Sequence, residues 1–166
     1  EKAQEHIREE KLGGKIATRL GNGLAPLEPG ETDTVIIAGM GGDLICKILK
    51  AKPEFLIEGK EFILQPQSEW FKIRRLLKEY HYQIEKEWFL KEDGKYYVII
   101  KAEPAWTQPQ RLKHQEPSIH EYIKEISEIP VNQAVSEKDM ESIYEQYGKY
   151  LIETKNPVLK EYLEKE

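Results

Sequence analysis

One segment constrains the fold more than any other, because an apolar strand runs into glycines and then directly into a helix. This segment, residues 34–49, reads TVIIAGMGGDLICKIL. Its β-branched start, residues 34–38, is typical of a strand buried on both faces of a parallel sheet. Three of the next four residues are glycine, and residues 43–50 have apolar side chains at helical spacing. This succession predicts an α/β sheet.

The chain continues with the same alternation of strands and helices. Residues 62–64 are expected to form a second buried strand, which a Gln-Pro pair ends. Ser68 is then expected to cap a helix that runs to about residue 80. Residues 82–90 and 95–102 flank a Glu-Asp-Gly turn, a pattern that predicts an antiparallel hairpin.

Upstream, residues 1–12 have the composition of a helix and end at two glycines, and residues 15–20 alternate like a strand. The whole pattern predicts an open, mostly parallel α/β sheet with an antiparallel terminal hairpin and a C-terminal helical segment.

Three units are expected along the chain. Residues 1–104 hold the α/β part, and residues 105–135 form a proline-rich excursion with one short helix at 118–127. Residues 136–166 are predicted to be helical, beginning with a capping-box start at Ser136 and continuing at helical spacing to residue 151.

Composition limits the class of protein. The longest apolar runs fall far short of the roughly 20 residues of a membrane span, and no signal peptide is recognisable. The single Cys46 excludes an internal disulfide and favours a reducing compartment, so a cytoplasmic location is predicted. The four histidines and this cysteine lack metal-ligand spacing, and no metal is expected. Oligomeric state is left open.

The net charge of −5 argues against non-specific binding of polyanions, although it leaves room for a local basic patch. Such a patch is predicted on the helix after Ser68, whose basic outer side is expected to consist of Lys72, Arg74, Arg75 and Lys78. A solvated helix face is the default interpretation, and contact with nucleic-acid phosphate is the alternative.

Three predicted strand ends carry unusual residues, and ligands bind beyond such ends in open α/β sheets. The three ends are residues 21–24, 39–42 and 65–67, which read GNGL, GMGG and QPQ. Glycine lets the backbone approach a flat ligand, and the amide of Asn22 suits the edge of a nucleobase. The alternatives are steric glycines, a turn-forming Asn22 and an Asp43 that only complements the helix dipole.

Five segments together resemble the bacterial tRNA (adenine-N1) methyltransferases that act on adenine 22. They are KIATRLGNGL, DTVIIAGMGGDLICKIL, FILQPQ, WFLKEDGKYYVIIKAE and YGKYLIETKNPVLKEYLEKE. The resemblance implies a Rossmann-like class I methyltransferase fold, S-adenosylmethionine as cofactor and tRNA as partner. It also implies that the chain is a fragment, because the family's first strand with its glycine-rich loop and its acid-ending second strand have no counterpart before residue 1.

The resemblance also assigns roles to residues. Gly21, Asn22, Gly23, Leu24 and Gly39 would bind the cofactor, with Asn22 beside its adenine where the family usually has Asp. Gly39, Met40, Gly41, Gly42 and Asp43 would form the catalytic segment between the methyl donor and the base. Gln65, Pro66, Lys72 and Arg75 would contact the substrate.

Two other functions compete with methyl transfer. A non-catalytic relative would bind RNA or a protein partner through the same sheet. A nucleotide-dependent oxidoreductase on a related fold would bind NAD, although the reversed terminal hairpin counts against it.

Overall fold

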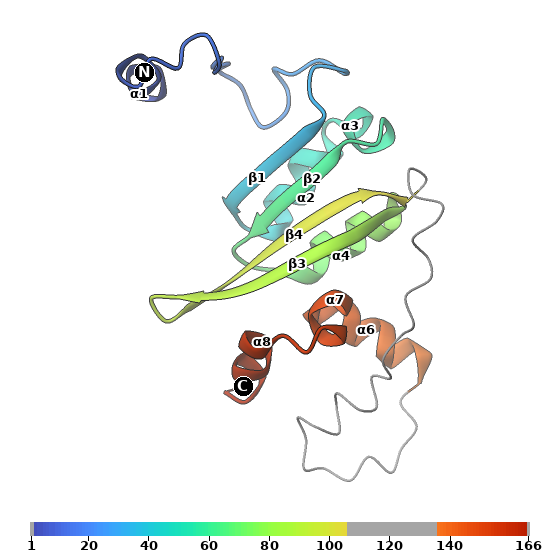
Figure 1. The fold of residues 1–166 in the computed structure, drawn as a ribbon. Coiled ribbons are helices and arrows are strands. Elements are labelled where there is room, and N and C mark those ends of the chain that lie inside the picture. Colours follow the sequence, from blue (N-terminus) through green and yellow to red (C-terminus); the bar gives the residue numbers. More distant parts are fainter. Residues whose placement is uncertain (1, 106–135, 166) are drawn as a thin grey trace.

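Four strands form one mixed sheet in the computed structural model, which describes residues 2–105 and 136–165 (Figure 1). The strands are β1 (Thr34–Met40), β2 (Glu61–Pro66), β3 (Tyr82–Glu92) and β4 (Lys95–Pro104), in the spatial order β1-β2-β4-β3. The β1–β2 pair is parallel, whereas β4 is antiparallel to both β2 and β3. The predicted α/β class and its terminal hairpin are therefore confirmed, with the parallel pairing limited to one pair of the described strands.

A layer of helices covers one face of this sheet. It contains α2 (Gly42–Lys50), the unpredicted short α3 (Pro53–Ile57) and α4 (Trp70–Glu79) (Figure 1). Alternate strand residues point into the layer, so that Phe62 and Leu64 of β2 are fully buried. Their burial with apolar residues of the helices fixes the sheet against α2 and α4.

The expectation that residues 34–38 are buried on both faces is wrong. Val35 and Ile37 are buried, but the side chain of Ile36 between them is 68% exposed. The reason is that β1 is an edge strand and that, among the described residues, helices pack on only one face of the sheet.

The strand predicted for residues 15–20 is also wrong. These residues have no regular secondary structure and are all exposed, including Leu20. Alternation alone does not make a strand, because its backbone groups need a neighbouring strand to pair with. The helix predicted just before them is present as α1 (Lys2–Glu9), although none of its residues is buried.

The predicted cap of α4 differs from the observed one. Glu69, not Ser68, occupies the N-cap position, in a left-handed conformation with φ 54°, and its side chain makes no capping bond. Ser68 instead uses its carbonyl oxygen, which accepts a hydrogen bond from the Gly42 N–H at 2.9 Å. The turn before α4 is therefore shaped by its contact with α2.

Three helices follow at the C-terminal side: α6 (Glu137–Tyr147), α7 (Lys149–Glu153) and α8 (Pro157–Leu163). The Ser136 cap is confirmed by a 3.2 Å bond from the Asp139 N–H to the Ser136 hydroxyl. The expected continuous helix to residue 151 is interrupted at Gly148, where φ is 90°. The excursion at 106–135, with its predicted helix, lies outside the described residues. None of the described helices combines the length and the apolar character needed to cross a membrane.

A buried ion pair joins these C-terminal helices to the sheet. Arg74 on α4 donates from Nε to Glu87 Oε1 on β3 at 2.8 Å, and the two side chains are 4% and 0% exposed. Arg74 Nη1 also donates to the carbonyl oxygens of Glu145 and Gln146 at the end of α6, at 2.9 Å each. Gly148 lies against the pair, because a Cβ there would be 2.3 Å from Glu87 Oε2. Burial raises the pKa of Glu87, against the opposing attraction of Arg74.

Candidate functional site

The carboxyl ends of β1 and β2 lie side by side. Their parallel register pairs Ala38 with Gln65 and Met40 with Pro66. Beyond the last pair, the Gln67 N–H donates to the Met40 carbonyl at 2.8 Å. The structure therefore brings together two of the three predicted strand ends, GMGG and QPQ.

A β-bulge at Gly39 interrupts the register between these strands. Gly39 has φ 77°, a conformation that favours glycine, and a Cβ at this position would meet nothing within 4 Å. Its N–H donates to the side-chain Oε1 of Gln65 at 2.8 Å. Gln65 thus satisfies a backbone donor that the bulge withdraws from the ladder.

The last glycine of GMGG has a packing role. A Cβ on Gly42 would lie 2.6 Å from the backbone oxygen of Glu69 and 2.7 Å from that of Ser68. On Gly41, the N-cap of α2, a Cβ would approach only the Ser68 hydroxyl, at 3.2 Å. Close contact between α2 and the turn before α4 therefore explains Gly42 without a ligand, whereas Gly39 faces open space.

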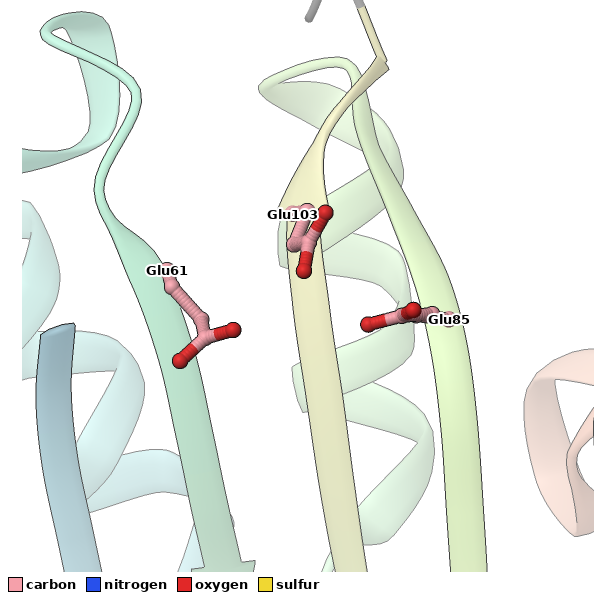
Figure 2. A group of neighbouring side chains, drawn as sticks. All are labelled: Glu61, Glu85 and Glu103. Atoms are coloured by element: carbon pink, nitrogen blue, oxygen red, sulfur yellow. The ribbon is translucent and has the colours of Figure 1, made fainter. Parts of the chain in front are cut away.

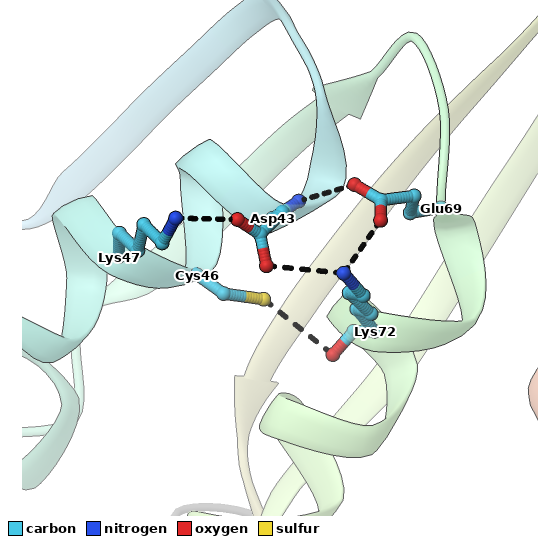
Figure 3. Close-up of polar contacts among 5 residues, drawn as sticks. All are labelled: Asp43, Cys46, Lys47, Glu69 and Lys72. Carbon is cyan, nitrogen blue, oxygen red and sulfur yellow. Dashed lines mark hydrogen bonds and ion pairs between the residues drawn. The ribbon is translucent and has the colours of Figure 1, made fainter.

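Asp43 belongs to a polar network between α2 and α4 (Figure 3). Its carboxylate oxygens contact Lys47 Nζ at 2.7 Å and Lys72 Nζ at 3.0 Å, and these bonds hold its pKa below the ordinary value. Glu69 contacts Lys72 at 2.5 Å and accepts a bond from the Asp43 N–H at 3.1 Å. Cys46 donates from Sγ to the Lys72 carbonyl at 3.6 Å, and burial raises the pKa of its thiol. This network fastens the first turns of the two helices to each other.

The third predicted strand end, residues 21–24, lies elsewhere. A Cβ on Gly23 would be 2.9 Å from the Ile48 side chain, which is six residues, or about 9 Å of helix rise, beyond Gly42 on α2. A Cβ on Gly21 would be 2.7 Å from the Pro26 ring. Leu24 is part of the core, and Asn22 is exposed.

The predicted basic outer side of α4 is wrong for Arg74, whose side chain is buried against Glu87. The other three cations of this side are matched by carboxylates. Besides Lys72, Arg75 binds Glu145 of α6 at 2.8 Å, and Lys78 pairs with Glu141. Glu145 occupies Nε and Nη2 of Arg75, whose side chain is 63% exposed, so a phosphate at Arg75 would share the guanidinium with Glu145 or displace it.

Sequence reasoning missed a cluster of carboxylates on the sheet face that lies away from α2 and α4 (Figure 2). Oxygens of Glu61, Glu85 and Glu103 lie within 4.8 Å of one another, and Lys101 Nζ contacts them at 2.9, 2.6 and 3.1 Å. These contacts raise the pKa of Lys101. The lysine thus supplies the positive charge that a metal ion would otherwise bring. The opposite charges of Lys101 and Glu103, two residues apart and therefore on one face of β4, were the signal for this cluster in the sequence. A surface depression beside Glu61 lies at the amino end of β2, away from GMGG.

Comparisons with known proteins point to one family. The profile of the TrmK family, tRNA (adenine(22)-N(1))-methyltransferase, matches residues 1–166. A tRNA (adenine(22)-N(1))-methyltransferase of Bacillus subtilis (strain 168) is 39% identical over 101 residues, which are 61% of this chain and 42% of that protein.

Solved structures give the same result. A putative tRNA (m1A22) methyltransferase of Streptococcus pneumoniae, in complex with S-adenosyl-L-methionine, superposes with a TM-score of 0.71 at 26% identity, covering 98% of this chain and 62% of that one. A protein of the NADB-Rossmann superfamily from Streptococcus agalactiae has a TM-score of 0.71 at 26% identity, with coverages of 98% and 58%. The chain thus spans less than two thirds of the length of these relatives.

Proposed function

This chain belongs to the tRNA (adenine(22)-N(1))-methyltransferase family. We propose that the protein methylates N1 of adenine 22 in tRNA. S-adenosylmethionine is the proposed methyl donor, as in the Streptococcus pneumoniae complex. The observation that carries the proposal in this chain is the pairing of the GMGG and QPQ strand ends at one edge of a Rossmann-like sheet. Family membership also favours methyl transfer over the oxidoreductase alternative.

The chemistry at these strand ends is mostly a matter of position. Adenine N1 carries an in-plane lone pair, so the base needs no deprotonation before it attacks a methyl group. The chain's task is to hold the flipped base in line with the donor. The open space at Gly39 leaves room for a flat ring, and the backbone carbonyls of this edge are suited to stabilise the positive charge that methylation leaves on the base.

Some of the proposed cofactor residues fit this role better than others. The cofactor supplies a methyl group on a sulfonium centre. Asn22 is exposed, so its amide can donate to and accept from an adenine edge. Gly39 has no side chain between its backbone and a ligand, whereas the side chain of Leu24 is buried in the core and is not free to contact the cofactor. Gly21 and Gly23 are accounted for by contacts within the chain, with Pro26 and Ile48.

Methyl transfer from labelled S-adenosylmethionine to unmodified tRNA transcripts tests the proposal. Two proteins are assayed with tRNAs that carry either adenine or guanine at position 22: the chain, and a version extended at both ends to the length of its relatives, which we call the complete protein. We expect incorporation by the complete protein that depends on this adenine. No incorporation by the complete protein into any transcript would overturn the proposal and favour a binding protein without catalysis.

Asp43 provides a second test. As a general base it would contribute about 10²–10⁴-fold to the rate. Adenine N1 needs no base and the Asp43 carboxylate is engaged by two lysines, so we expect Asp43→Asn to keep the methyl-transfer rate of the complete protein within about threefold. The same assay with saturating tRNA measures this rate. A loss of a hundredfold or more, at an unchanged melting temperature, would restore Asp43 to the catalytic role.

The substrate contacts proposed for Lys72 and Arg75 involve cations that already have carboxylate partners. Lys72 is bound by two carboxylates and Arg75 by one, so tRNA phosphate would compete with Glu69 and Glu145 for these cations. Counterion release makes real phosphate contacts salt-dependent. The logarithm of the tRNA-binding constant is therefore measured against the logarithm of the salt concentration, for Arg75→Ala and for the unaltered protein. A shallower slope for Arg75→Ala would show that this residue contacts phosphate, and an equal slope would show that it does not.

A further inference from the structure

The side chain of Tyr97 lies on the sheet face that points away from α2 and α4. Along β4, Val98 and Ile100 are buried under the helices, so the alternation of the strand turns Tyr97 to the opposite face. Gln65, near the carboxyl end of β2, lies on this same opposite face, because it alternates with the buried Leu64. Tyr97 therefore shares a face of the sheet with the QPQ strand end.

The hairpin of β3 and β4 extends past the ends of β1 and β2 (Figure 1). Its antiparallel register pairs Leu64 with Ile100, and the continuation of this register places Tyr97 opposite Gln67, the first residue after β2. On the other side of β2 lies β1, with Gly39 near its end. Because neighbouring strands are about 4.8 Å apart, Gly39 and Tyr97 flank the end of β2 at a separation of about 10 Å. A base held at this end has the Gly39 backbone on one side and the Tyr97 ring on the other.

The Tyr97 side chain has no structural partner that would explain it. It is partly exposed, and it makes no hydrogen bond, cation–π contact or aromatic pair with any residue that the structure describes. The neighbouring Tyr96 differs, because its ring stacks on Phe89 with 5.6 Å between the centroids and its hydroxyl accepts a bond from Lys165 at 3.0 Å. Tyr96 thus holds the fold together, whereas Tyr97 presents an accessible ring at the edge where methyl transfer is proposed.

We propose that the Tyr97 ring packs against the target adenine and stabilises the positive charge that methylation places on the base. This inference rests on the proposed function. In the transfer, the lone pair of N1 forms the bond to the methyl carbon, and sulfur keeps the electron pair of the bond that breaks. The positive charge thereby moves from the sulfonium to the base. An aromatic face attracts a cation that lies over it, so the contact strengthens as the charge arrives.

Two substitutions in the complete protein separate the ring from its hydroxyl. Tyr97→Phe keeps the aromatic face and removes the hydroxyl, whereas Tyr97→Leu removes the ring and keeps an apolar side chain. Tyr150→Leu is the matched control, because it makes the same change at a partly exposed position on α7, which packs on β3. Each protein is assayed for the single-turnover rate of methyl transfer with saturating tRNA and cofactor. Its Kd is measured for two tRNAs, one unmodified and one already methylated at N1 of adenine 22.

We expect Tyr97→Phe and Tyr150→Leu to stay close to the unaltered protein in both measurements. Tyr97→Leu should lower the single-turnover rate about tenfold, the scale of one lost cation–π contact away from water. It should also weaken the binding of methylated tRNA more than that of unmodified tRNA, because only the methylated base is cationic. A residue that merely supported the fold would not distinguish the two tRNAs. The Kd for S-adenosylmethionine should be unchanged.

Three results would overturn the inference while leaving the proposed function intact. A Tyr97→Phe variant as slow as Tyr97→Leu would assign the effect to the hydroxyl. Equal Kd changes for the two tRNAs in Tyr97→Leu, including no change for either, would mean that the ring does not respond to the charge on the base. A weakened Kd for S-adenosylmethionine in Tyr97→Leu would place the ring against the cofactor. An unaltered complete protein that methylates no tRNA at all would refute the proposed function and this inference together.

Discussion

Glu87→Ala is expected to lower the free energy of unfolding of the chain by about 3–5 kcal/mol, the typical cost of removing one partner of a buried ion pair. The substitution leaves the Arg74 guanidinium 4% exposed without its carboxylate, held only by the carbonyl oxygens of Glu145 and Gln146. Because these carbonyls end α6, the loss should reach the docking of the C-terminal helices on the sheet. Urea unfolding followed by circular dichroism measures the change.

Two variants separate the buried charge from simple loss of contacts. The double variant Arg74→Met/Glu87→Leu replaces the pair with apolar side chains and should recover most of the stability, because it leaves no buried charge unpaired. Glu145→Ala removes the exposed partner of Arg75 and should change stability little. If Glu87→Ala costs no more than Glu145→Ala, the pair is not buried in solution.

The fold could be predicted wherever the sequence pattern is local. The β-branched run of β1, the helical spacing in α2 and α4, and the turn between β3 and β4 all depend on neighbours in sequence, and these elements are present. The strand prediction for residues 15–20 was wrong because a strand depends on a partner strand that its own sequence does not encode. The predicted burial of Ile36 was also wrong, because the position of β1 at the edge of the described sheet depends on the strand order and not on the sequence of β1 itself.

The candidate site could be predicted only as a set of residue types. The glycines of GMGG were recognised, but their separate causes were not: a positive φ at Gly39, and a backbone contact across two helices at Gly42. The bond between Gln65 and Gly39 spans 26 residues and depends on a one-residue bulge. The buried Arg74–Glu87 pair could not be predicted, because charged residues are rarely buried and nothing in the sequence around these two residues indicates that they are.

Gly42→Ala is expected to have the other large effect, on both stability and activity. The new Cβ would lie 2.6–2.7 Å from two backbone oxygens, which cannot rotate away as side-chain atoms can. The starts of α2 and α4 would have to separate, breaking the bond from the Gly42 N–H to the Ser68 carbonyl. Overpacking and this lost bond together should cost about 2–4 kcal/mol of unfolding free energy. A shift of about 1 Å beside the GMGG segment should also lower methyl transfer by the complete protein about a hundredfold.

Gly41→Ala is the matched control for this prediction, because it makes the same chemical change one residue earlier. Gly41 has φ −63°, which alanine adopts readily, and its Cβ would meet only the Ser68 hydroxyl at 3.2 Å, a group that rotates away. Urea unfolding and the methyl-transfer assay should therefore find Gly41→Ala close to the unaltered protein and Gly42→Ala strongly impaired. Equal losses in the two variants would mean that a ligand at the strand end, and not the contact between α2 and α4, requires both glycines.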